Sequence, residues 1–146
     1  MKRKLVIAAD HAGYHLKHEL IDFLHNRGYA VTDLGTDSPE SVDYPDYGHP
    51  LAEAVESGEF ALGISICGSG NGINMTTNKH KGIRGALCWN VEIAELARKH
   101  NDANICSLPA RFIDAPLAKE IVSTFLSTPF EGGRHLQRIG KIPLEN

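Results

Sequence analysis

Short runs of apolar residues alternate along this chain with longer segments in which apolar residues recur every three or four positions. The short runs are typical of buried strands, and the longer spacing is typical of a helix with one buried face. The predicted strands are 4–9, 29–34, 61–66, 85–89 and 103–108. The predicted helices are 14–27, 46–56, 73–80, 91–100 and 114–126. Residues 35–45 predict a polar loop, because they are rich in turn-forming residues.

Strands that alternate with helices predict an α/β fold with right-handed crossovers. We expect a Rossmann-like three-layer sandwich, in which a five-stranded parallel sheet has helices on both faces. The 146 residues suit a single domain, 1–146, without repeats or linkers. Ligands of such sheets bind beyond the carboxyl ends of the strands, near a switch in strand order. Polar residues that directly follow strands are therefore the first candidates for a site.

The third predicted strand runs into the segment Ile66-Cys67-Gly68-Ser69-Gly70-Asn71-Gly72-Ile73-Asn74. A glycine-rich turn between a strand and a helix directs several backbone N–H groups at one point, together with the positive end of the helix dipole. Such a point suits a phosphate or a developing oxyanion. The same field favours the thiolate of Cys67, a candidate base or nucleophile. Alternatively, the glycines only form a tight turn and Cys67 is a small buried residue.

Other glycine-rich motifs do not fit this turn. A P-loop requires Gly-Lys-Ser/Thr where this chain has Gly72-Ile73-Asn74, and the dinucleotide fingerprint G-x-G-x-x-G fails at Ile73. A cysteine phosphatase loop would need an arginine at position 73, and a redox Cys-x-x-Cys would need a cysteine at position 70. The turn therefore predicts an anion site beside a reactive thiol, without nucleotide-binding or phosphatase chemistry.

Residues near other strands and helices extend the list of candidates. Asp10 and His11 follow the first strand and Arg111 follows the fifth, so all three are expected to border the same cleft as Cys67. Asp10 and His11 could instead cap the next helix. His100 and Asn101 end a helix, which predicts the opposite edge of the sheet. A two-fold dimer would present them to the cleft of the neighbouring subunit.

Several other residues have a simple structural interpretation. On local sequence alone, His100 is a surface residue at a helix C-terminus, and Arg134 and Arg138 form a solvated helix face. His11 and His15 have metal-ligand spacing but lack the glutamate of H-E-x-x-H, so we expect no metal site. His18 is interpreted as a surface residue. The two other cysteines, Cys88 and Cys106, fall in predicted strands and are interpreted as core residues.

Charge and composition limit the partners. A formal net charge of −3 gives no general attraction to nucleic acid, so affinity for an anion has to come from a local cluster. No apolar run reaches 18 residues, which predicts no membrane span. The first apolar stretch breaks at Asp10 and is too short for a signal peptide, and three cysteines argue against a disulfide framework. We therefore expect a cytoplasmic protein.

Several short motifs, spread over nearly the whole chain, occur together in one known family. They are Ala9-Asp10-His11-Ala12-Gly13, Asp43-Tyr44-Pro45, Ile66-Cys67-Gly68-Ser69-Gly70-Asn71-Gly72, Asn78-Lys79, Gly82-Ile83-Arg84, His100-Asn101-Asp102 and Glu131-Gly132-Gly133-Arg134-His135. In order and spacing they resemble the ribose-5-phosphate isomerase B family, which includes allose-6-phosphate and galactose-6-phosphate isomerases. The resemblance implies a metal-free aldose–ketose isomerase without a cofactor, working as a homodimer whose sites draw on both subunits.

The resemblance also implies residue roles. Cys67 is the base that moves a proton between C2 and C1 of the open-chain sugar, and His100 is the acid that opens the furanose ring. Ser69 keeps the hydroxyl of the threonine found in many members and counts as a third catalytic residue. A subgroup with a glutamate base at the position of Ile73 is excluded. The implied substrate-binding residues are Asp10, His11, Tyr44, Gly68, Gly70, Asn71, Gly72, Asn101, Arg111, Arg134, His135 and Arg138, with the three arginines on the phosphate.

The leading hypothesis is the interconversion of ribose 5-phosphate and ribulose 5-phosphate. One alternative is isomerisation of a six-carbon sugar phosphate such as allose 6-phosphate, because the sequence does not reveal the length of the cleft. A second alternative is a sugar-phosphate sensor without turnover. Binding alone would need neither Cys67 nor His100, which favours an enzyme.

Overall fold

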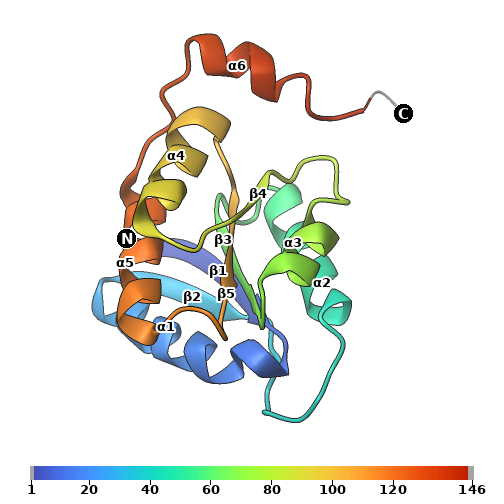
Figure 1. Cartoon of the computed structure of the whole chain (residues 1–146), viewed down its shortest axis with the longest axis vertical. Coiled ribbons are helices and arrows are strands. Elements are labelled where there is room, and N and C mark those ends of the chain that lie inside the picture. Colours follow the sequence, from blue (N-terminus) through green and yellow to red (C-terminus); the bar gives the residue numbers. More distant parts are fainter. Residues whose placement is uncertain (1, 145–146) are drawn as a thin grey trace.

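Five parallel strands form one sheet in the order β2-β1-β3-β5-β4 (Figure 1). The computed structural model describes residues 2–144. The strands are β1 (Arg3–Ala9), β2 (Tyr29–Asp33), β3 (Gly63–Cys67), β4 (Gly85–Leu87) and β5 (Ile105–Pro109). The helices are η1 (His11–Gly13, a 3₁₀ turn), α1 (Tyr14–Asn26), α2 (Pro45–Glu56), α3 (Asn71–Thr77), α4 (Val91–Asn101), α5 (Ala115–Ser127) and α6 (Arg134–Ile139).

The sheet separates two hydrophobic layers. Along β1, Leu5, Ile7 and Ala9 pack with apolar residues of α1, α4 and α5, whereas Val6 and Ala8 pack with those of α2. This alternation follows the two-residue period of a strand. In Figure 1, α2 and α3 lie on one side of the sheet and α1, α4 and α5 on the other. The predicted three-layer α/β fold is confirmed.

The order of the strands creates a crevice between β1 and β3. The chain leaves β1 toward β2 on one side and returns to β3 on the other, so the strand order reverses between these neighbours. Ligands of open α/β sheets bind at such a point. Asp10 follows β1 and its backbone N–H donates to the carbonyl of Ile66 (3.1 Å), which holds Asp10 beside Cys67.

Two of the differences from the predicted elements bear on the site. Helix α3 begins before position 73, because Gly70 takes a left-handed backbone conformation (φ +76°) from which the chain enters the helix directly. The turn η1 precedes α1, because the Asp10 carboxylate accepts hydrogen bonds from the backbone N–H groups of Ala12 (3.0 Å) and Gly13 (3.2 Å). Asp10 is thus a capping residue, one of the two roles expected for it.

The C-terminal segment follows α4 to the edge of the sheet where the strands begin. The backbone N–H of Glu131 donates to the carbonyl of Lys99 (3.1 Å), and α6 packs near the end of α4 (Figure 1). This edge lies opposite the one that carries Cys67. Within residues 2–144, the structure contains no helix of the length and apolar character that a membrane crossing requires.

Candidate active site

Cys67, the last residue of β3, lines a cleft at the carboxyl edge of the sheet. The cleft has a volume of about 510 Å³. Its wall consists of Asp10, Tyr44, Cys67, Gly68, Ser69, Gly72, Arg111 and Phe112. Cys67 is only 4% exposed, so it is shielded from bulk water while it remains part of the wall. The structure brings Asp10, Cys67 and Arg111 together, as the sequence predicted.

The two other cysteines lie away from this cleft. Cys88 and Cys106 are fully buried in the layer that contains α4 and α5. The hydrogen bond with Cys88 and burial raise the pKa of the Cys106 thiol well above its usual value. Cys106 therefore stays protonated, and among the three cysteines only Cys67 borders the described cleft.

Arg111 lies against the backbone of the glycine turn. A Cβ atom added to Gly68 would lie 3.1 Å from the guanidinium Nη1 of Arg111, and the backbone N–H of Arg111 donates to the carbonyl of Gly68 (3.0 Å). A side chain at position 68 would therefore require the arginine to shift slightly. The exposed positive charge next to the turn makes this part of the cleft suitable for an anionic group.

A buried chain of hydrogen bonds holds α3, which starts from the glycine turn. The Ser107 hydroxyl donates to Oδ1 of Asn74 (3.0 Å), so the 2.6 Å contact between the two serine hydroxyls has Ser65 as its donor. The backbone N–H of Asn74 donates to the carbonyl of Gly70 (3.2 Å). The chain therefore connects the centre of β3 and β5 to the turn that lines the cleft.

Tyr44 covers the other end of the glycine turn. A Cβ atom added to Gly72 would lie 2.6 Å from Cζ of the Tyr44 ring, which is shorter than any real contact. Tyr44 itself is 40% exposed and belongs to the cleft wall. Glycine at position 72 thus lets the tyrosine ring rest directly on the start of α3.

We expect Gly72→Ala to destabilise the protein by about 1–3 kcal/mol through this clash. In a Tyr44→Ala background the same change should be neutral or stabilising, because alanine is the better helix former by roughly 1 kcal/mol. Urea unfolding of the four proteins in a double-mutant cycle measures the coupling. Equal effects of Gly72→Ala in both backgrounds would contradict the contact.

His11 connects two segments near the cleft. Its Nδ1 accepts a hydrogen bond from the backbone N–H of Val42 (3.1 Å), in the loop that leads to Tyr44. Since Nδ1 is an acceptor, the neutral ring carries its proton on Nε2. His11 is absent from the described cleft wall, unlike Asp10, and its contact holds the loop in place.

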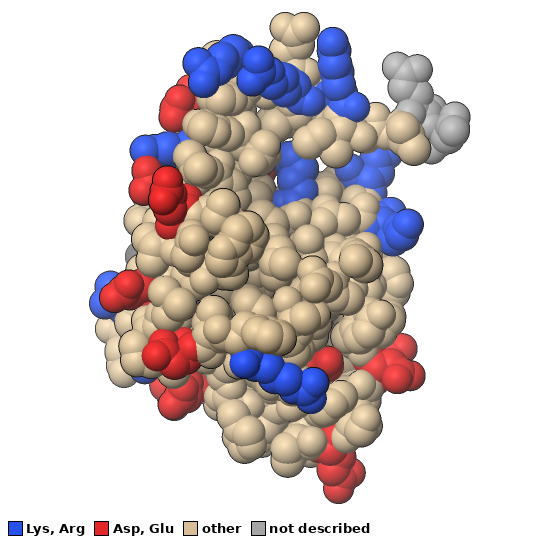
Figure 2. Space-filling model, in the orientation of Figure 1, with Lys and Arg blue, Asp and Glu red and all other residues tan. Residues whose placement is uncertain are grey.

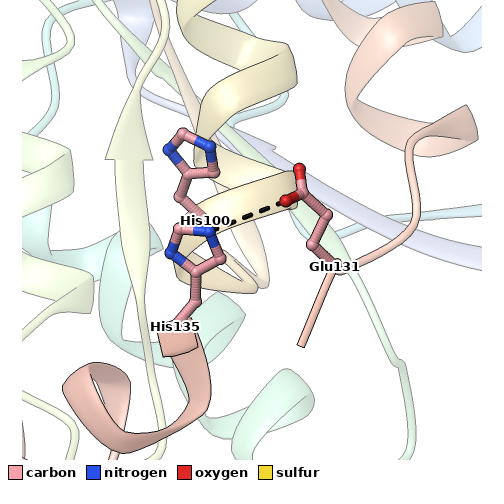
Figure 3. A group of neighbouring side chains, drawn as sticks. All are labelled: His100, Glu131 and His135. Atoms are coloured by element: carbon pink, nitrogen blue, oxygen red, sulfur yellow. Dashed lines mark ion pairs between the residues drawn. The ribbon is translucent and has the colours of Figure 1, made fainter. Parts of the chain in front are cut away.

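The remaining candidate side chains gather at the opposite edge of the sheet. The imidazole rings of His100 in α4 and His135 in α6 are stacked, with centroids 4.3 Å apart and planes 15° from parallel (Figure 3). Glu131 Oε1 lies 3.7 Å from Nε2 of His135. Burial lowers the pKa of His135, and the positive charges of His100 and Arg134 lower it further.

Two arginine side chains fix the end of α4 at this edge. Asp102 takes a left-handed conformation (φ 46°) and its carboxylate accepts from Nη1 of Arg98 (2.9 Å). Nε of Arg84 donates to the carbonyl of Asn101 (3.1 Å), and Asn101 is exposed. Arg134 and Arg138 are also exposed, and Figure 2 shows Lys and Arg side chains gathered along α6. This edge thus combines imidazoles with free positive charge.

The donor atoms of His100, Glu131 and His135 lie within 4.8 Å of one another, which raises the question of a metal site. An imidazole nitrogen binds a metal in the plane of its ring. Two nearly parallel stacked rings send their lone pairs along nearly parallel lines, so a cation in the plane of one ring lies outside the plane of the other. The observed stack does not fit a metal centre.

Within this chain the two groups of candidates do not meet. A strand of five residues spans roughly 15 Å, and β3 separates the edge with Cys67 from the edge with His100.

Sequence reasoning missed two residues of interest. Phe112, 76% exposed, borders the cleft, and Glu131 accompanies the stacked histidines. In the sequence, Phe112 was indicated only by its position next to Arg111, and Glu131 only by its place in the motif Glu131-Gly132-Gly133.

Comparison with known proteins identifies the family. The model of a family described as Ribose/Galactose Isomerase matches residues 5–142. The chain belongs to this family. Ribose-5-phosphate isomerase B of Escherichia coli (strain K12) is 44% identical over 140 residues, which cover 96% of this chain and 94% of the relative. D-erythrulose-4-phosphate isomerase of Pectobacterium atrosepticum is 40% identical and covers 94% and 91%. The sugars named for these relatives thus differ in length.

Solved structures of the ribose/galactose isomerase family share the fold. Ribose-5-phosphate isomerase B of Clostridium thermocellum is 54% identical, with a TM-score of 0.94 over 95% of this chain and 94% of that one. The Mycoplasma genitalium enzyme of the same name, with bound ribulose-5-phosphate, is 40% identical, with a TM-score of 0.93 over 97% and 95%. The resemblance inferred from the motifs is confirmed, and the chain is an isomerase.

Proposed function

We propose that the protein interconverts ribose 5-phosphate and ribulose 5-phosphate through an enediolate. The observation that carries this proposal is the position of Cys67 in a cleft with Asp10, the glycine turn and Arg111. The ribose-5-phosphate isomerase B names of relatives, and the ribulose-5-phosphate bound to the Mycoplasma genitalium enzyme, support this choice of substrate.

The central step is a proton transfer between neighbouring carbons. The Cys67 thiolate removes the proton from C2 of the open-chain aldose, and the electron pair forms the C1–C2 double bond while negative charge develops on the oxygen at C1. Preorganised N–H donors stabilise such a charge most effectively, and the backbone of the turn 68–72 supplies them. Cys67 then returns the proton to C1, and the Ser69 hydroxyl passes a proton between the two oxygens.

Two further tasks require the residues at the opposite edge. Ribose 5-phosphate is mainly a closed furanose, so an acid has to protonate the ring oxygen as its bond to C1 breaks, and His100 has suitable chemistry. Arg134 and Arg138, with Arg111, suit a phosphate. We infer a homodimer in which His100, Asn101 and α6 of one subunit complete the cleft of the other, because two-fold symmetry creates two such composite sites.

An assay of ketose formation from ribose 5-phosphate tests the proposal directly. We expect turnover with kcat/KM higher for ribose 5-phosphate than for allose 6-phosphate. A higher kcat/KM for allose 6-phosphate would contradict this choice and identify the six-carbon sugar phosphate as the substrate. Tight binding of both sugars without ketose formation would instead identify a sensor.

The role of His100 predicts different effects on two measurable steps. His100→Asn should lower the rate of ribose 5-phosphate consumption roughly 10²–10⁴-fold, the usual contribution of a general acid. Ribulose 5-phosphate cannot form a furanose through a 5-hydroxyl that carries phosphate, and exchange of its C1 hydrogen requires only the base. NMR in heavy water should therefore show deuterium entering C1 of ribulose 5-phosphate at a nearly unchanged rate.

Loss of deuterium exchange in parallel with ribose 5-phosphate consumption would contradict a specific role in ring opening. Replacement of the nearby surface residue Lys99 by glutamine is a suitable control, since its side chain pairs with Glu95. We expect both rates to remain within about twofold of the wild type in this control.

A further inference from the structure

The stacked histidines combine a half-buried ring with a buried one. His135 is 5% exposed, whereas His100 is partly open to solvent at the end of α4. Their rings overlap face to face at 4.3 Å, with planes only 15° apart (Figure 3). A ring held in this way cannot rotate freely about its Cβ–Cγ bond without losing the contact. The buried ring therefore restricts the orientation of the exposed one.

The position of His135 is itself fixed from two directions. It is the buried residue of α6, and the backbone N–H of His135 donates to the carbonyl of Gly132 (3.2 Å). The segment before α6 is joined to α4 through the bond from Glu131 to Lys99 (3.1 Å). His135 and the His100 ring stacked on it are thus both held at the C-terminal end of α4.

The charges around His135 favour its neutral form. Burial is the largest cause of its lowered pKa, and His100, Arg134 and Arg138 add positive charge that also lowers it, whereas Glu131 opposes them. A neutral ring can accept a protonated imidazole on its face, because the π-system attracts a cation. Two charged rings at this distance would repel each other. The pair is therefore arranged so that only His100 needs to carry the mobile proton.

We propose that His135 is a positioning residue that holds the His100 imidazole in the orientation required for opening the sugar ring. The inference rests on the proposed function, since it assigns His135 a task within the same composite site. In this role the face of the His135 ring contacts His100, and direct contact of His135 with the substrate is not required. The flat, neutral character of the ring is what matters, and its nitrogen atoms are dispensable.

The decisive variants are His135→Phe, which keeps a flat neutral ring, and His135→Ala, which removes it. His135→Ala should lower ribose 5-phosphate consumption roughly 10–100-fold, the effect of misplacing a catalytic group by about 1 Å. Deuterium exchange at C1, measured at saturating ribulose 5-phosphate, should fall far less than ribose 5-phosphate consumption in His135→Ala, because this exchange does not require ring opening. His135→Phe should restore most of the ribose 5-phosphate activity.

A second measurement needs no turnover. NMR of the His100 ring hydrogens should show a ring-current shift that His135→Ala abolishes and His135→Phe retains. An unchanged His100 spectrum in His135→Ala would overturn the proposal, and so would equal loss of both rates or failure of phenylalanine to restore activity. Absence of isomerisation by the wild type would refute the proposed function instead, and the NMR comparison would still decide whether the stack orients His100.

Discussion

Replacing Cys67 by serine is expected to lower kcat for ribose 5-phosphate by roughly 10²–10⁴-fold, the contribution of a general base. Serine has a similar shape, but its hydroxyl is far too weakly acidic to supply an anion at neutral pH. Binding should persist, because Arg111 and the turn backbone do not depend on the sulfur. A ketose-formation assay and a binding titration with ribose 5-phosphate measure the two effects separately.

Cys88→Ser provides the matched control for this change. Cys88 is also a buried thiol, but it lies in the hydrophobic layer and contacts the carbonyl of Ala86, outside the described cleft. It should lower stability without lowering kcat. Near-normal turnover in Cys67→Ser would reject the assignment of the base, whatever the control shows.

Mixing two inactive variants is expected to restore activity. If each site uses Cys67 of one subunit and His100 of the other, a dimer of one Cys67→Ser chain and one His100→Asn chain contains one intact site and one doubly defective site. Random exchange makes half of the dimers mixed, so about a quarter of all sites should work. Activity measured after unfolding and refolding the mixture should approach this fraction of the wild type.

The double variant, carrying both changes in one chain, is the control for the mixing experiment. When the double variant is mixed with the wild type, each site of a mixed dimer lacks one of the two residues. The activity of this mixture should therefore fall below the average of its two components. Mixtures of the single variants that remain as inactive as their components would show that both residues serve one site within a chain, or none. Either result would refute the composite site.

The alternation of short apolar runs with longer amphipathic segments was sufficient to predict the fold class. The apolar runs along β1 and β3 are buried on both faces, so they show no alternation, and their short length distinguishes them from helices. The strand order could not be predicted in this way. That β5 lies between β3 and β4 depends on the packing of α4 and α5, and nothing in the local sequence specifies this.

The candidate site was predicted unevenly. Asp10, Cys67 and Arg111 each lie at or just beyond the carboxyl end of a strand, so topology alone brings them together. The stack of His100 on His135 could not be predicted, because it depends on the path of residues 128–133 between α5 and α6. The resemblance to a known family placed His135 among substrate-binding residues, and a sequence does not distinguish a ring that touches a sugar from one that supports its neighbour.

The hydrogen-bond chain through Ser65, Ser107 and Asn74 has a consequence for ligand affinity. Glycine-rich segments are usually mobile, and a mobile loop loses entropy when a ligand orders it. Here the helix that starts in the turn is tied to the middle of the sheet before any sugar arrives. Binding should therefore cost little ordering of this segment, and the amide hydrogen of Asn74, which donates to the carbonyl of Gly70, should already exchange slowly with solvent in the free protein.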